Sequence, residues 1–226
     1  MIRPALRWLL WVQLPVLLTL ALSHNVRSSD EPGLFARLEA QSAQRYGRGA
    51  AVLVRDWGRL VGEGQRLSDA ERLTLANGFF NRRLPFEEDI IVWRVIDHWA
   101  TPLEFTGVGM GDCEDYVIAK YKTLQLMGVP RERLRFIYVR ASIGAAPPVA
   151  HMVLGYYAEP GAEPLILDNL VPTVRPASQR TDLAPVYSFN AEGLWVGNAS
   201  RSAADPTVRL SKWRDLLQRL REEGLN

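Results

Sequence analysis

The chain has 226 residues, of which 47% are hydrophobic, so it can bury the core of one ordinary domain. Its 27 basic side chains include Arg3 and Arg7; without segment 1–23, which has no acidic residue, 25 basic side chains face 25 acidic ones. This balance excludes the strongly basic class of nucleic-acid-binding proteins.

The first 23 residues have the pattern of a secretory signal peptide. Two arginines precede an apolar run from Trp8 to Leu22, and Ala21-Leu-Ser23 supplies small residues for cleavage. The apolar run is short for a membrane-spanning helix. We therefore predict export to the periplasm, with residues 24–226 as a single mature domain. An uncleaved inner-membrane anchor is the alternative.

The N-terminal half of the mature chain is predicted to be helical. Leu34, Leu38 and Ala43 fall roughly on one face of the first segment. Ser68-Asp-Ala-Glu71 has the pattern of a capping box that opens another helix.

Two further helical segments are predicted in the middle of the chain. Five apolar residues have helical spacing before a stop at Thr101-Pro102: Ile90, Ile91, Val95, Ile96 and Trp99. After two glycines, a helix is predicted from about Cys113 to Met127, and Gly128 and Pro130 end it.

Beyond residue 130 the hydrophobic period becomes that of strands. Five short β-rich runs are separated by turn residues: Leu134–Arg140, Ala150–Tyr157, Pro164–Asp168, Val186–Phe189 and Leu194–Val196. A last amphipathic helix is predicted from Ser211 to about Glu223. Because the helices come first and the strands cluster after them, the sequence predicts an α+β fold with an antiparallel sheet.

Cys113, the only cysteine in the chain, is the first candidate for a catalytic role. A lone cysteine in an exported protein forms no internal disulfide, and its ordinary role is that of a small buried hydrophobic residue. Cys113 instead stands at the start of a predicted helix, between Asp112 and Glu114. A helix N-terminus favours a thiolate through its dipole and its free N–H groups, so this position indicates a nucleophile.

His151 and Asp168 are the candidate partners of the thiol. His151 lies within the run Ala150–Tyr157, and Asp168 follows the apolar run Leu165-Ile-Leu167. Taken singly, each has an ordinary explanation, as a half-buried histidine and as a residue that ends a strand. The order of nucleophile, base and carboxylate is more specific, because such a carboxylate can keep the imidazole in the useful tautomer.

At these positions the chain resembles the bacterial transglutaminase-like cysteine proteinases, the LapG-type periplasmic proteases. The main matches are Gly111-Asp-Cys-Glu-Asp-Tyr116, Ala150-His-Met-Val153 and Leu167-Asp-Asn-Leu170. Further matches, within roughly residues 30 to 197, are Asn77-Gly-Phe-Phe-Asn81, Trp99-Ala-Thr-Pro102, Pro176-Ala-Ser178 and Tyr187-Ser-Phe-Asn190. The resemblance implies a papain/transglutaminase-like core and a catalytic triad at Cys113, His151 and Asp168.

The resemblance also implies calcium dependence through the acidic neighbours of the nucleophile, Asp112 and Glu114. Carboxylates beside a thiol raise its pKa, which disfavours the thiolate, and a bound Ca²⁺ would cancel that penalty. A role for Asp112 and Asp115 as helix caps is the alternative. We interpret Asp115 as a cap, and Asp112 and Glu114 as the metal site.

Members of the family cut very large surface adhesins near their N-terminus, beside paired alanines, and so release cells from biofilms. The resemblance therefore implies a repeat-rich adhesin as substrate. It also implies an inner-membrane LapD-like receptor that responds to cyclic-di-GMP and sequesters the protease. Two alternatives stay open: transglutaminase activity, in which an amine resolves the acyl-enzyme, and a non-catalytic receptor-binding module.

Overall fold

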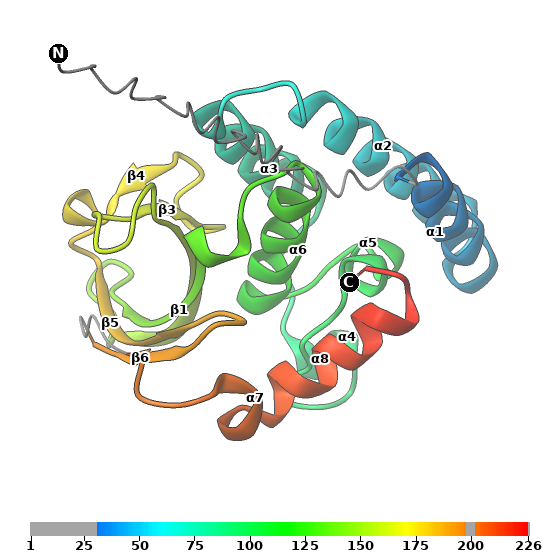
Figure 1. Ribbon diagram of the computed structural model, residues 1–226. Coiled ribbons are helices and arrows are strands. Elements are labelled where there is room, and N and C mark those ends of the chain that lie inside the picture. The colour runs from blue at the N-terminus through cyan, green and yellow to red at the C-terminus, as the bar shows by residue number, and fades with distance from the viewer. Residues whose placement is uncertain (1–30, 198–201, 226) are drawn as a thin grey trace, which may run out of the picture.

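The computed structural model describes residues 31–197 and 202–225, and the predicted signal peptide lies outside these residues (Figure 1). Within the described part of the chain, no helix is long and apolar enough to cross a membrane.

Two N-terminal helices, α1 (Glu31–Tyr46) and α2 (Arg48–Gly64), pack on one another at one side of the molecule (Figure 1). Gly47 joins them with a φ of 90°, a conformation that glycine adopts at low cost. On α1, Leu34 and Leu38 are buried, but Ala43 is exposed and Ser42 is buried beside it. The predicted apolar face of this helix is therefore wrong by one residue at its C-terminal end.

α3 (Asp69–Arg83) begins at the predicted capping box. Ser68 Oγ accepts a hydrogen bond from the Glu71 N–H at 3.5 Å, and the Ser68 N–H donates to Glu71 Oε2 at 2.9 Å. The helix packs against α6 (Cys113–Leu126), whose residues 114–124 are all buried. α6 is therefore the central helix of the domain, and its first residue is the predicted nucleophile.

The segment between residues 89 and 99 is not the long helix that its apolar spacing predicts. Only one turn, α4 (Asp89–Val92), is helical, and the chain then bends through Arg94 and Asp97, both with a φ of 60°. The prediction is wrong because four of the apolar residues face away from the core and are exposed: Ile90, Ile91, Val95 and Ile96. Thr101 does not end a helix but caps α5 (Pro102–Val108).

A six-stranded antiparallel sheet follows, in the order β4-β3-β2-β1-β5-β6. Its strands are β1 (Leu134–Ala141), β2 (Val149–Tyr156), β3 (Leu165–Leu167), β4 (Arg175–Pro176), β5 (Leu183–Phe189) and β6 (Leu194–Val196). Five of them overlap the predicted runs, and the two-residue β4 is the addition. The α+β fold with an antiparallel sheet is confirmed.

One face of the sheet packs against α6 and α8 (Ser211–Glu222) through aromatic rings, and α7 (Pro206–Arg209) precedes α8 (Figure 1). The centroid of Phe136 lies 5.0 Å from those of Phe189 and Trp213 and 4.7 Å from that of Tyr121. The opposite face has a smaller core around Val153. Side chains alternate along β2, so His151 lies on the face of Val153, as the strand period predicts.

Candidate active site

Cys113 lies where α6 begins, and the chain reaches it through a glycine that no other residue could replace without movement. A Cβ added at Gly111 would lie 2.3 Å from Asp115 Oδ2 and 2.9 Å from the ring of Phe105. The Gly111 carbonyl accepts a hydrogen bond from the Glu87 N–H at 2.9 Å. This contact brings the segment before α4 close to Cys113.

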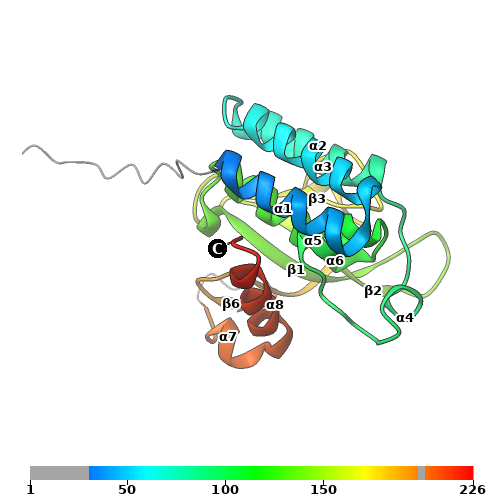
Figure 2. The ribbon, with the colours of Figure 1, turned by 90° about the vertical axis from the view of Figure 1, so that its right-hand side faces the viewer.

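A cleft of about 1120 Å³ is lined by both Cys113 and His151. Its walls come from the segment around α4 and from the β1–β2 hairpin, which lie on the same side of the molecule (Figure 2). Several of its lining side chains are exposed and apolar: Phe86, Ile90, Ile96, Ile143, Val149 and Leu170. Two of the apolar residues on which the wrong helix prediction rested, Ile90 and Ile96, therefore line this cleft.

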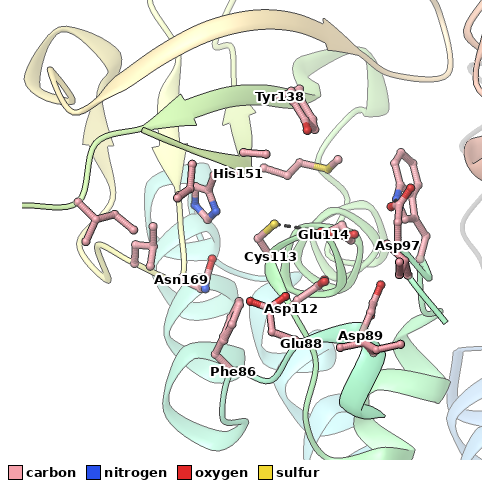
Figure 3. A pocket seen from close by; sticks show the side chains of 18 of the residues that line it. Phe86, Glu88, Asp89, Asp97, Asp112, Cys113, Glu114, Tyr138, His151 and Asn169 are labelled. Carbon is pink, nitrogen blue, oxygen red and sulfur yellow. Dashed lines mark hydrogen bonds between the residues drawn. The ribbon is translucent and has the colours of Figure 1, made fainter. Parts of the chain in front are cut away.

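The imidazole of His151 is paired with Asp168. His151 Nε2 lies 2.8 Å from Asp168 Oδ1, and both side chains are buried. With Nε2 engaged in this way, Nδ1 is the ring nitrogen left to exchange a proton, and the ring and the thiol of Cys113 lie in the same cleft (Figure 3). Cys113 and His151 therefore line the same cleft, and Asp168 contacts His151.

Asp168 is bound by three further groups. Its Oδ1 accepts the Leu170 N–H at 3.0 Å, its Oδ2 accepts Arg180 Nη2 at 2.6 Å, and its backbone carbonyl accepts Asn81 Nδ2 at 2.7 Å. Burial by itself raises the pKa of this carboxyl, but the hydrogen bonds and charges of His151 and Arg180 lower it to about 2. Asp168 is therefore an ionised carboxylate with its counter-charge built into the fold.

Four acidic side chains lie on the other side of Cys113, and among the described residues no arginine or lysine forms an ion pair with any of them. Asp112, Cys113 and Glu114 place ligand atoms within 4.8 Å of one another, and so do Asp89, Asp112 and Asp115. Burial and mutual repulsion raise the pKa of Asp112, Glu114 and Asp115. Within residues 31–197 and 202–225, Asp112 Oδ1 and Asp89 Oδ1 are buried without a hydrogen-bond partner. These oxygen atoms fit a hard divalent cation.

The acidic group acts directly on the thiol. Cys113 Sγ donates a hydrogen bond to Glu114 Oε2 at 3.0 Å (Figure 3). Burial first, and then the charge of Glu114, raise the pKa of Cys113, whereas the Met152 N–H lowers it. Next to unneutralised carboxylates the thiol is therefore protonated and weakly nucleophilic.

Asp115 has the capping role that we predicted. Its carboxylate accepts the Asp112 N–H at 3.4 Å and the Ala100 N–H at 2.8 Å. It therefore connects the start of α6 to the segment that precedes α5. Asp112 is the N-cap residue of α6 and forms a capping box with Asp115.

Sequence reasoning missed three residues of this region: Asn81, Asp89 and Arg180. Asn81 ends a segment that matches the family, but nothing in the sequence places it beside Asp168. Asp89 stands beside the run interpreted as a helix, and Arg180 follows the matching segment Pro176-Ala-Ser178 by two positions. Only the folded chain brings Asn81 and Arg180 to Asp168, and Asp89 to Asp112.

Comparison with known proteins agrees with this arrangement. Residues 64–196 match the family described as bacterial transglutaminase-like cysteine proteinase. Calcium-bound LapG of Legionella pneumophila is 38% identical, with 82% of this chain and 98% of that chain covered and a TM-score of 0.71. LapG of the same organism without a stated ligand and its EGTA-treated form are each 39% identical, with coverages of 82% and 97% and TM-scores of 0.69 and 0.71.

No curated protein matches the chain in sequence. The family match covers more than half of the chain, and the matched structures are covered almost completely. The chain therefore belongs to the bacterial transglutaminase-like cysteine proteinase family, and it is a cysteine protease of the LapG type.

Proposed function

We propose that the protein is a calcium-dependent periplasmic endopeptidase that uses Cys113, His151 and Asp168 to cut the N-terminal region of a large surface adhesin. The observation that carries this proposal is the pairing of His151 with Asp168 at 2.8 Å in a cleft that also contains Cys113. A thiol at a helix start, a base and a carboxylate on the base are the three parts of a cysteine-protease triad.

In the proposed reaction His151 Nδ1 takes the proton of the Cys113 thiol, and the sulfur attacks the carbonyl carbon of the scissile peptide bond. The imidazolium then gives that proton to the leaving amine, which leaves a thioester on Cys113. Water attacks the thioester with His151 as base, and the carboxylate product departs. Asp168 accepts the Nε2–H throughout, and the Cys113 N–H donates to the oxyanion.

Asp112 and Glu114 are the proposed calcium ligands, and the structure adds Asp89 as a candidate. The support is their burial, their mutual repulsion and the unpartnered oxygens of Asp112 and Asp89 in the described part of the chain. The relatives described as calcium-bound and EGTA-treated support the same ion. A bound cation supplies the positive charge that the carboxylates lack, and it lowers the energy of a neighbouring thiolate.

The proposed substrate is an adhesin segment with paired alanines, and the proposed regulator is an inner-membrane LapD-like receptor that responds to cyclic-di-GMP. Release of the adhesin would promote biofilm dispersal. Both partners, and the periplasmic location, rest on the family resemblance and on the signal pattern of residues 1–23. The exposed apolar lining of the cleft supports a substrate with apolar residues near the cut.

The test is cleavage of a purified N-terminal adhesin fragment that contains paired alanines. We expect Cys113→Ser and His151→Ala each to abolish cleavage, while circular dichroism shows an unchanged fold. Mass spectrometry of the products separates the alternatives, since hydrolysis adds one water and transglutamination leaves an isopeptide. Cleavage by either variant at the wild-type rate would overturn the triad, and complete inactivity of the calcium-loaded wild type would favour the non-catalytic module.

A further inference from the structure

Resting on the proposed triad, we propose that Arg180 is a positioning residue for the reaction, which fixes the rotation of the Asp168 carboxylate so that only Oδ1 is presented to His151. Arg180 Nη2 lies 2.6 Å from Asp168 Oδ2, whereas Oδ1 receives His151 Nε2 and the Leu170 N–H. The two carboxylate oxygens therefore have separate partners. Rotation of the carboxylate would break all three contacts.

The guanidinium is itself fixed by Asp182. Arg180 Nε lies 2.9 Å from Asp182 Oδ1, and Nη2 lies 2.7 Å from Asp182 Oδ2. The fork geometry of a guanidinium suits this paired contact, which a lysine ammonium cannot reproduce. Only 2% of the Arg180 side chain is exposed, and none of the Asp168 side chain is. Solvent therefore competes little for either group.

The backbone before and after Arg180 is also held in place. Arg180 follows a single 3-10 turn, Ala177–Gln179, and its N–H donates to the Ala177 carbonyl at 2.9 Å. Its own carbonyl accepts the N–H of Leu183, the first residue of β5, at 3.1 Å. The backbone hydrogen bonds at the start of β5 thus fix the position of Arg180, and Arg180 in turn fixes the carboxylate of Asp168.

Lys120 is a second cation near Asp168, but it does not fit this role. It is fully buried on α6, and its Nζ has no hydrogen-bond partner among residues 31–197 and 202–225. Burial lowers the pKa of Lys120 to about 7, although Asp168 raises it. Lys120 is therefore only partly charged near neutral pH and makes no bond to the carboxylate, so the orienting role falls to Arg180.

The experiment compares Arg180→Gln and Arg180→Lys with the wild type in calcium, with kcat and KM measured separately on the adhesin fragment. We expect Arg180→Gln to lower kcat by about 10- to 100-fold at unchanged KM, because a misplaced catalytic group slows the chemical step without weakening substrate binding. Arg180→Lys restores the charge but not the fork, so it should recover part of that loss. The low-field NMR signal of the proton between His151 Nε2 and Asp168 should weaken in Arg180→Gln.

Arg55→Gln is the matched control, because it removes an arginine from an exposed ion pair with Glu39 and leaves the cleft untouched. It should keep both the wild-type kcat and the NMR signal. Wild-type kcat together with an unchanged NMR signal in Arg180→Gln would overturn the inference. If that variant does not fold, Asp182→Asn must lower kcat at unchanged KM, and a wild-type kcat there would overturn it equally. Retained cleavage by Cys113→Ser would instead refute the proposed triad.

Discussion

The carboxylates on the two sides of Cys113 are buried in similar degree but balanced in different ways. Asp168 has an arginine within 2.6 Å and is held ionised, whereas Asp112 and Glu114 face other carboxylates and the thiol. The negative charge of Asp168 is therefore balanced by a residue of the protein itself. The charges of Asp112 and Glu114 need an added cation to balance them. We therefore expect the fold alone to fix the Asp168 side and a bound ion to alter the Asp112 side.

The largest effect on stability should come from removing Asp168, whose charge Arg180 balances. Asp168→Ala leaves the Arg180 guanidinium buried with only Asp182 as partner, which should cost about 3–5 kcal/mol of unfolding free energy. The lowered pKa of Asp168 means that its contribution is present above about pH 4 and is lost as the pH falls toward 2. Urea unfolding at pH 7 and pH 3 measures both effects. An equal loss at the two pH values would contradict this linkage.

The acidic side should respond to calcium. Saturating Ca²⁺ at about 1,000 times its dissociation constant should stabilise the protein by about 4 kcal/mol, and excess chelator should remove both this gain and the activity reversibly. Mg²⁺ should restore less, because it demands stricter geometry and gives up its waters reluctantly. Thermal melts and cleavage assays measure this. Full activity in excess chelator would rule out the site.

The pH dependence of stability in the calcium-free protein should also distinguish Asp112 and Glu114 from Asp168. The raised pKa values of Asp112 and Glu114 mean that the folded state binds more protons, so calcium-free stability should fall as the pH rises from 5 to 7. The double variant Asp112→Asn/Glu114→Gln should reduce this slope, to which Asp115 also contributes, and should lose most of its calcium affinity, as measured by calorimetry. A role in helix capping predicts a calcium-independent loss of about 1 kcal/mol instead.

Lys120 should give a smaller effect with the opposite pH direction. Its folded pKa of about 7 lies below the usual 10.5, so the unfolded state binds more protons and stability rises with pH between these values. Lys120→Met should remove that slope and stabilise the protein at pH 7 by about 1–4 kcal/mol, since a buried charge is replaced by an apolar side chain. A destabilised Lys120→Met variant with the wild-type slope would contradict this reasoning.

The smallest effect on stability should come from Ser68, at the start of α3 and outside the cleft. Ser68→Ala removes the cap of α3 and should cost about 1 kcal/mol of stability with no change in kcat or calcium affinity. Guanidinium unfolding beside the cleavage assay measures it. A change in calcium affinity would show that the helices and the acidic side are coupled.

Local patterns predicted the two elements that carry Cys113 and His151. The α6 helix has two glycines before it and Gly128 after it, and the strands show their period, so both were recognisable from neighbouring residues. The helix expected from residue 90 to 99 failed because helical spacing reports apolar residues without telling whether they face a core or a cleft. Ile96, at 81% exposure, is the clearest instance.

The partners of Asp168 lay beyond sequence reasoning for a different reason. Asn81 is 87 positions from Asp168, and Arg180 is reached only after β4 and a 3-10 turn. Their contacts depend on tertiary packing, and a polar residue in a loop has many ordinary explanations. The excess of unpaired acids around Asp112 was visible in part, because three of the four are consecutive or nearly so, but Asp89 was not.

The hydrogen bond from Cys113 to Glu114 has a consequence for the durability of the enzyme. Peroxide and other oxidants attack the thiolate far faster than the thiol, and a chain with one cysteine has no second thiol to rescue a sulfenic acid as an internal disulfide. By keeping the sulfur protonated in the absence of a cation, Glu114 should also shield it from oxidative damage. Calcium should therefore increase the rate at which peroxide inactivates the protein, so that readiness for catalysis and vulnerability to oxidation rise together.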